Sequence, residues 1–102
     1  MVRELDKKGF DEALQVKDRP VVVNFSADWC PYCRLLAPVI EDLAAEYAGK
    51  IDVYHVDTDE QEELAARYDI MTIPTVFVFL NGEVKNSAVN PRNKEALLDL
   101  VF

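Results

Sequence analysis

Two cysteines stand three positions apart, in the segment Cys-Pro-Tyr-Cys from Cys30 to Cys33, and the chain has no others. A pair at this spacing can form a disulfide, contribute to a metal site or exchange disulfides with other thiols. A structural crosslink is disfavoured, because so short a loop constrains almost nothing. A metal site needs about four ligands, and the chain adds only the distant His55, so zinc or an iron–sulfur cluster would need a second copy or an outside thiol. The pair therefore favours dithiol redox chemistry.

The segments around the pair predict a strand before it and a helix after it. The segment 20–25, PVVVNF, is apolar on both faces, which is typical of a strand buried in a mostly parallel sheet. After Cys33, apolar residues recur at helical spacing, and Gly49 is a natural stop. Cys30 would then lie at the start of the helix, where unpaired N–H groups and the helix dipole stabilise a thiolate. We therefore expect Cys30 to attack a target disulfide and the less exposed Cys33 to resolve the product.

The residues between the cysteines favour the same helix start. Pro31 suits the first helical turn, where a missing N–H costs little. Tyr32 keeps its N–H, so we expect the amides of both Tyr32 and Cys33 to point at the Cys30 sulfur.

The rest of the chain predicts alternating strands and helices. Asn81-Gly82 between two β-branched segments indicates a hairpin, and the last helix has an inner face of Leu97, Leu98 and Val101. The order β-α-β-α-β-α-β-β-α predicts one domain, residues 1–102, of the α/β class. It would be a three-layer α/β/α sandwich with a central mixed five-stranded sheet. The elements expected beside the cysteine pair are a short strand near Leu5, a helix with Phe10 and Leu14, a strand at 51–56, a helix at 58–69, and strands at 75–80 and 83–89.

The charge balance limits the partners. With 19 acidic and 11 basic residues the net charge is −8, which argues against binding to nucleic acid or an anionic membrane surface. The first residues do not resemble a signal peptide, and no segment could span a bilayer. We therefore expect a cytoplasmic monomer without a metal, whose redox group is the Cys30–Cys33 disulfide itself rather than a bound cofactor.

Several segments together resemble the thioredoxin family over nearly the full length of the chain. They are VVVNF, ADWCPYC, Pro38 five residues past Cys33, TIPTVFVF and NGEV. The resemblance implies the thioredoxin fold and a protein-disulfide oxidoreductase that acts on disulfide-containing proteins. It also implies that Trp29 flanks the site, although core packing is the simpler alternative for a tryptophan. The residues expected to shape the substrate groove are Trp29, Pro31, Tyr32, Thr72, Ile73, Pro74 and Val89.

By the same resemblance, Pro74 is expected to be cis and to face the cysteines across the groove. Its predecessor Ile73 would pair main chain to main chain with an extended substrate segment. A proline that opens a strand agrees with this placement.

The insert between the cysteines departs from the family. Thioredoxins usually carry Gly-Pro there, whereas Pro-Tyr resembles the glutaredoxins, which work with glutathione. A thioredoxin-reductase-type enzyme and glutathione therefore both remain possible electron sources, and a glutathione-linked activity remains an alternative. Two further alternatives are a metal or iron–sulfur cluster bridged between two copies through Cys30, and a docking module without catalysis.

Other departures lie beneath and beside the site. Asn24 stands where the family has a buried aspartate, and an amide cannot accept a proton. His55 replaces the neighbouring lysine, and we expect paired strands to bring it beside Asn24 under Cys33. His55 either relays a proton for Cys33 or only hydrogen-bonds to Asn24. Asn90, in place of a glycine, and Thr58, in place of an apolar residue, are expected to reshape the rim of the groove.

Overall fold

The structure of the protein is a computed structural model that describes residues 2–102. Its elements follow the predicted order, and the hairpin strands have the predicted bounds. No helix within these residues is both long and apolar enough to cross a membrane. The elements are β1 (Arg3–Glu4), α1 (Lys7–Ala13), β2 (Val21–Ser26), α2 (Pro31–Glu46), β3 (Asp52–Asp57), α3 (Glu62–Arg67), β4 (Thr75–Leu80), β5 (Glu83–Val89) and α4 (Lys94–Val101).

The five strands form one mixed sheet in the order β1-β3-β2-β4-β5. Strands β1, β3 and β2 are parallel, while β4 and β5 run antiparallel to their neighbours. The central strand β2 is buried at all six positions, as its run of apolar residues predicts. Within this sheet, Asn24 of β2 lies opposite His55 of β3.

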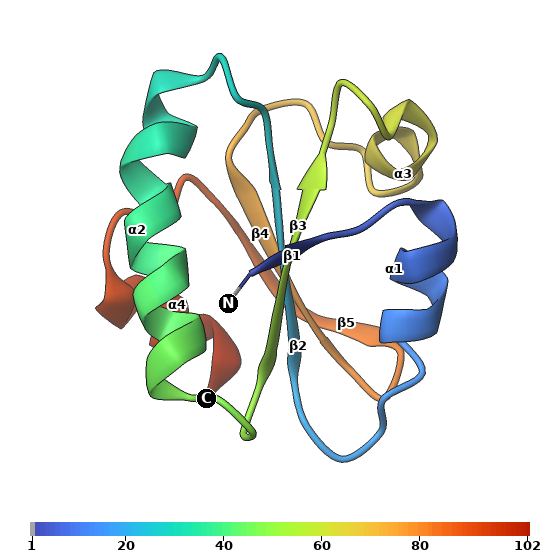
Figure 1. Ribbon diagram of the computed structural model, residues 1–102, viewed down its shortest axis with the longest axis vertical. Coiled ribbons are helices and arrows are strands. Elements are labelled where there is room, and N and C mark those ends of the chain that lie inside the picture. The colour runs from blue at the N-terminus through green and yellow to red at the C-terminus, as the bar shows by residue number, and fades with distance from the viewer. Residues whose placement is uncertain (1) are drawn as a thin grey trace.

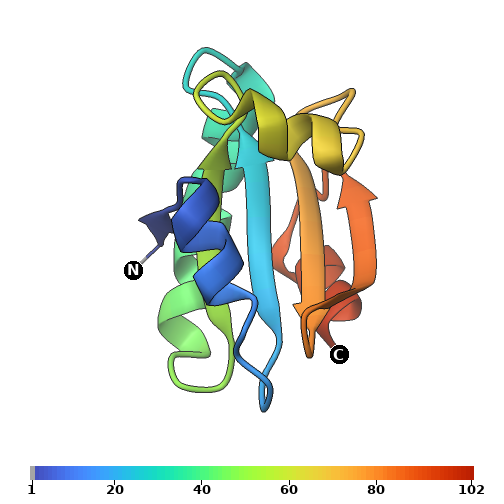
Figure 2. The same ribbon diagram turned by 90° about the vertical axis from the view of Figure 1, so that its right-hand side faces the viewer.

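Helices cover both faces of the sheet and complete the predicted three layers. Helices α2 and α4 lie on one face and α1 and α3 on the other, with the sheet seen edge-on between them in Figure 1. Figure 2 shows α1 and α3 lying across the strands of the second face. Leu97 and Val101 of α4 are fully buried and Leu98 is half-buried, which confirms the predicted inner face of the last helix.

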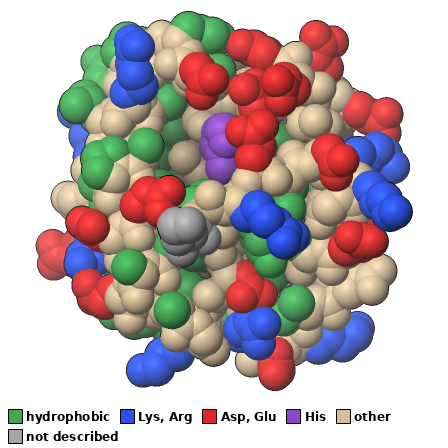
Figure 3. All heavy atoms as spheres, viewed as in Figure 1, with side chains coloured by type: hydrophobic (Ala, Val, Ile, Leu, Met, Phe, Trp, Pro, Cys, Tyr) green, Lys and Arg blue, Asp and Glu red, His purple; other side chains and the backbone are tan. Residues whose placement is uncertain are grey.

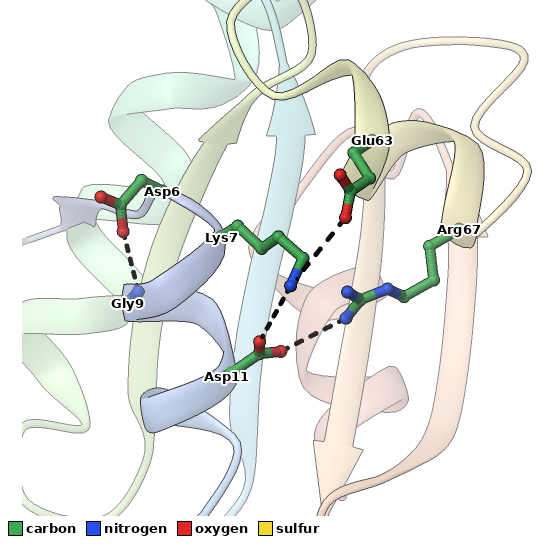
Figure 4. A network of polar contacts seen from close by, with 6 residues as sticks. All are labelled: Asp6, Lys7, Gly9, Asp11, Glu63 and Arg67. Atoms are coloured by element: carbon green, nitrogen blue, oxygen red, sulfur yellow. Dashed lines mark hydrogen bonds and ion pairs between the residues drawn. The ribbon is translucent and has the colours of Figure 1, made fainter.

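The second face encloses an aromatic core. Phe10 of α1 is fully buried, and its ring lies 5.7 Å from that of Phe79 and 5.6 Å from that of Tyr68. Above this core, charged side chains connect the two helices. Asp11 of α1 forms an ion pair with Lys7 of the same helix at 3.6 Å and accepts a hydrogen bond from Arg67 of α3 at 3.3 Å. Figure 4 shows the Arg67 contact bridging the two helices.

Turn positions agree with the residue types that occupy them, with one difference. Asn81 and Gly82 have positive φ angles of 54° and 82°, as a tight hairpin turn requires. Helix α2 ends at Glu46, so Gly49, with φ of 84°, lies in the following turn and not at the helix end itself. The extra residues let the chain reverse before β3 begins.

Candidate active site

Cys30 is the N-cap of α2, which begins directly after it at Pro31. The Cys30 Sγ accepts a hydrogen bond from the backbone N–H of Cys33 at 3.2 Å. No such bond comes from Tyr32 within residues 2–102, so the expectation of two donors is wrong for Tyr32. The geometry of an N-cap explains this. The Cys30 side chain bonds to the N–H of Cys33, the third residue of the helix, whereas Tyr32 is the second.

Both cysteines are free thiols, and they are buried to nearly the same degree. Cys30 is 4% exposed and Cys33 is 5% exposed, so the expectation that Cys33 is the less exposed of the two is wrong. The reason lies in a distant segment that packs over the helix start. The Cys30 Sγ lies 3.8 Å from the carbonyl oxygen of Ile73.

The environment of Cys33 favours its protonated form. Burial raises the pKa of the Cys33 thiol to about 11, and hydrogen bonding to Cys30 adds to the rise. Burial has this effect because a thiolate loses hydration that a neutral thiol does not need. Cys33 must therefore give up a proton before it can act as a nucleophile at neutral pH.

The segment that covers Cys30 has the expected geometry. The peptide bond between Ile73 and Pro74 is cis, which confirms the expectation from the resemblance. Thr75 Oγ1 donates a 2.5 Å hydrogen bond to the carbonyl oxygen of Thr72 and closes the turn. Thr72 is exposed and Ile73 half-buried, so the main chain before Pro74 borders the protein surface beside Cys30.

Exposed apolar side chains surround the cysteine pair. Trp29 is 63% exposed, so the core-packing alternative is excluded, and its indole N–H donates to Asp59 at 2.7 Å. Tyr32 and Val89, also expected in the groove, are exposed as well. Each of these side chains leaves apolar area available to a partner.

A hollow of about 320 Å³ lies beside Tyr32, between α2 and the segment after β5. Asn90 lines it and has a φ of 50°, a left-handed conformation that favours glycine and is tolerated by asparagine. Sequence reasoning missed Leu35, which is exposed on α2, and Arg92, whose guanidinium lies 5.7 Å from the Tyr32 ring. Leu35 could have been found, since it lies off the buried stripe of its helix.

A larger cavity of about 440 Å³ lies on the other side of α2, with Cys33, Asn24, Ser26 and His55 among its lining residues. The expected juxtaposition of Asn24 and His55 beneath Cys33 is therefore present. Thr58, another departure from the family, follows β3 and donates its amide to the carbonyl oxygen of Ser26 at 3.0 Å.

The alternative in which His55 hydrogen-bonds to Asn24 is wrong. His55 Nε2 lies 2.5 Å from Ser26 Oγ, and His55 Nδ1 lies 3.3 Å from a carboxylate oxygen of Glu4. Ser26 is two residues beyond Asn24 and thus on the same face of β2, so the ring reaches it diagonally. Asn24 Oδ1 is buried without a hydrogen-bond partner among the described residues.

Comparisons with known proteins agree with this site and fold. A family model described as Thioredoxin matches residues 1–101. The chain is 43% identical over 100 residues to an M-type chloroplastic thioredoxin of Spinacia oleracea, covering 98% of this chain and 55% of the relative. It is 37% identical over 101 residues to a thioredoxin of Rickettsia bellii, covering 99% of this chain and 96% of the relative. The chain thus spans little more than half of the plant relative and nearly all of the bacterial one.

A solved structure of Plasmodium falciparum thioredoxin superposes with a TM-score of 0.88 at 30% identity, covering 98% of this chain and 96% of that one. This confirms the thioredoxin fold expected from the sequence. The cysteine pair at a helix N-cap, the cis-proline facing it and the family match over residues 1–101 agree with one another. This chain belongs to the thioredoxin family.

Proposed function

We propose that the protein is a thiol–disulfide oxidoreductase that reduces or exchanges disulfides of other proteins through Cys30 and Cys33. The observation that carries this proposal is the Cys30 thiol at the N-cap of α2, bonded to the Cys33 amide and 3.8 Å from the Ile73 carbonyl. The family match supports the same activity, and it does not favour the glutathione-linked or cluster-binding alternatives.

The proposed reaction has two exchange steps. The Cys30 thiolate attacks one sulfur of the target disulfide, forming a mixed disulfide and releasing the first target thiolate. Cys33 then loses its proton and attacks the Cys30 sulfur. The second target thiolate leaves, and the Cys30–Cys33 disulfide forms. Two electrons have passed to the target, and no bound cofactor takes part.

The proposed substrate site is the surface around Cys30. The main chain of Ile73 borders the surface beside Cys30, and backbone pairing there suits an extended peptide segment. The exposed rings of Trp29 and Tyr32 on one side and Val89 on the other would flank that segment. The contributing residues are Trp29, Pro31, Tyr32, Thr72, Ile73, Pro74 and Val89.

The proposed partners are disulfide-containing proteins and a thioredoxin-reductase-type enzyme that renews the dithiol. Glutathione is the alternative electron source. We further propose that the protein works as a monomer in the cytoplasm. The bacterial relative supports the cytoplasmic location, whereas the plant relatives are described as chloroplastic.

The experiment is reduction of insulin disulfides coupled to NADPH oxidation, with thioredoxin reductase in one arm and with glutathione and its reductase in the other. Turnover in the first arm is expected. Cys30→Ser should abolish turnover, and Cys33→Ser should trap a mixed disulfide visible by mass spectrometry. Turnover that survives Cys30→Ser would overturn the proposal, and activity only in the glutathione arm would favour the alternative.

A further inference from the structure

A resolving cysteine needs a base, and the structure contains a candidate that the disulfide chemistry above does not use. Burial keeps the Cys33 thiol protonated at neutral pH. Asn24, a polar side chain of β2 that lines the same cavity, is an amide and cannot accept the proton. The inference that follows deepens the proposed function, since it concerns the second exchange step.

Glu4 of β1, His55 of β3 and Ser26 of β2 lie in a row, with an ion-pair contact between the first two and a hydrogen bond between the last two. The Glu4 carboxylate lies 3.3 Å from His55 Nδ1, and His55 Nε2 lies 2.5 Å from Ser26 Oγ. A carboxylate only accepts, so it selects the tautomer with hydrogen on Nδ1. Nε2 then carries the lone pair and accepts the Ser26 hydroxyl proton. The basic nitrogen, Nε2, thus faces the buried Ser26, whereas Nδ1 faces the more exposed Glu4.

The inner end of this row opens into the cavity beside Cys33. Ser26 is 5% exposed, and with His55, Asn24 and Cys33 it lines the same space of about 440 Å³. One water needs about 30 Å³, so the space is ample for water between Ser26 Oγ and the Cys33 thiol. Asn24 Oδ1, buried and without a partner among the described residues, is a ready acceptor for such a water.

We propose that Ser26, His55 and Glu4 form a proton relay that deprotonates Cys33 during resolution of the mixed disulfide. The Cys33 proton passes through water to Ser26 Oγ as the Ser26 hydroxyl proton moves to His55 Nε2. The Cys33 thiolate attacks the Cys30 sulfur, and the Cys30–target bond breaks. The departing target thiolate takes up a proton from solvent, and His55 later releases its own. Glu4 and Asn24 are positioning residues in this scheme.

Acidic side chains lie around His55. Glu4 contacts the ring from β1, and Asp57, on the same strand as His55, follows it by two residues. In the space-filling view of Figure 3, acidic side chains gather beside the purple histidine. The further charged groups in this environment are Asp28, Arg34 and Glu41 around the cavity, and Glu60, whose pKa is raised by Asp57 and Glu4.

The test is stopped-flow reaction of the reduced protein with Ellman's reagent. The first release of thionitrobenzoate reports attack by Cys30 and depends on reagent concentration. The second release reports resolution by Cys33 and does not. At pH 7, His55→Gln and Ser26→Ala should each slow the second phase at least about tenfold, while the first phase stays within about twofold. Glu4→Gln should slow the second phase less. Glu12→Gln, at an exposed glutamate away from this site, is the matched control and should leave both phases unchanged.

The pH profile and chemical rescue separate a relay from a merely structural role. The difference in second-phase rate between wild type and these variants should shrink towards pH 10, where hydroxide can deprotonate Cys33 directly. Imidazole added to His55→Ala should restore the rate of the second phase. Asn24→Asp combined with His55→Gln should also restore it, because the new carboxylate can accept the Cys33 proton.

An unchanged second phase in His55→Gln would overturn the relay, as would a deficit that neither imidazole nor Asn24→Asp relieves. Release of fewer than two thionitrobenzoates per wild-type protein would instead overturn the proposed function.

Discussion

The backbone N–H of Asn90 donates a 2.7 Å hydrogen bond to the carbonyl oxygen of Pro74. This bond joins the exit of β5 to the cis-proline segment that covers Cys30. Asn90 holds a left-handed conformation while its side chain lines the hollow beside Tyr32. The residue at position 90 must therefore adopt a positive φ angle and also lies on the rim of the site.

Substitutions at position 90 should separate the backbone requirement from the surface role. Asn90→Ala should lower the free energy of unfolding by about 1 kcal/mol, because alanine is disfavoured at positive φ. Asn90→Gly should be neutral or stabilising, since glycine adopts this conformation without strain. Urea denaturation of both variants measures the order, and equal stabilities would contradict the argument.

The reduced protein should lose stability in alkaline solution because of Cys33. Its folded-state pKa of about 11 lies above the unfolded value, which is about 8.5. As the pH rises, Cys33 ionises in the unfolded chain before it ionises in the folded protein. The stabilisation that protonated Cys33 gives the folded state is therefore complete below pH 8.5 and disappears as the pH rises through 11. The loss should reach roughly 3 kcal/mol.

Urea denaturation from pH 7 to 11 under reducing conditions measures the effect. Cys33→Ser removes the ionisable group, and its stability should fall less steeply over the same range. Parallel profiles for wild type and variant would show that Cys33 makes no such contribution.

The aromatic core should depend strongly on Phe10. Its ring is fully buried against Phe79 and Tyr68, so Phe10→Ala leaves a cavity beneath α1. The expected loss is about 3–5 kcal/mol in the free energy of unfolding. Phe102→Ala is the control, because Phe102 is 71% exposed and its loss should stay within about 0.5 kcal/mol. Similar losses in the two variants would contradict this assignment of the core.

The charged contacts between α1 and α3 should contribute little and should depend on salt. Asp11→Asn removes one partner of both Lys7 and Arg67. Since Asp11 is about half exposed, the loss should remain below about 1 kcal/mol. It should shrink further in 0.5 M sodium chloride through screening. A loss that is insensitive to salt in thermal denaturation would point to packing instead of charge.

The sequence by itself determined the order of the elements, the hairpin bounds and the place of Cys30 at a helix start. These features follow from local signals: apolar residues with periods of 2 or 3.6, Asn-Gly at the turn, and a proline after the first cysteine. The alignment of Asn24 with His55 could also be predicted, because both lie at corresponding positions of adjacent parallel strands.

Only the tertiary structure decided how the site is covered and which groups His55 contacts. Cys30 is as buried as Cys33 because Ile73, 43 residues further along the chain, packs against it. His55 contacts Ser26 and Glu4 because diagonal neighbours on a sheet depend on strand pairing and side-chain direction. Glu4 comes from a two-residue edge strand, and although the sequence predicts a short strand near Leu5, its pairing beside His55 depends on the fold. Such contacts depend on packing between distant segments, and residue spacing alone does not record that packing.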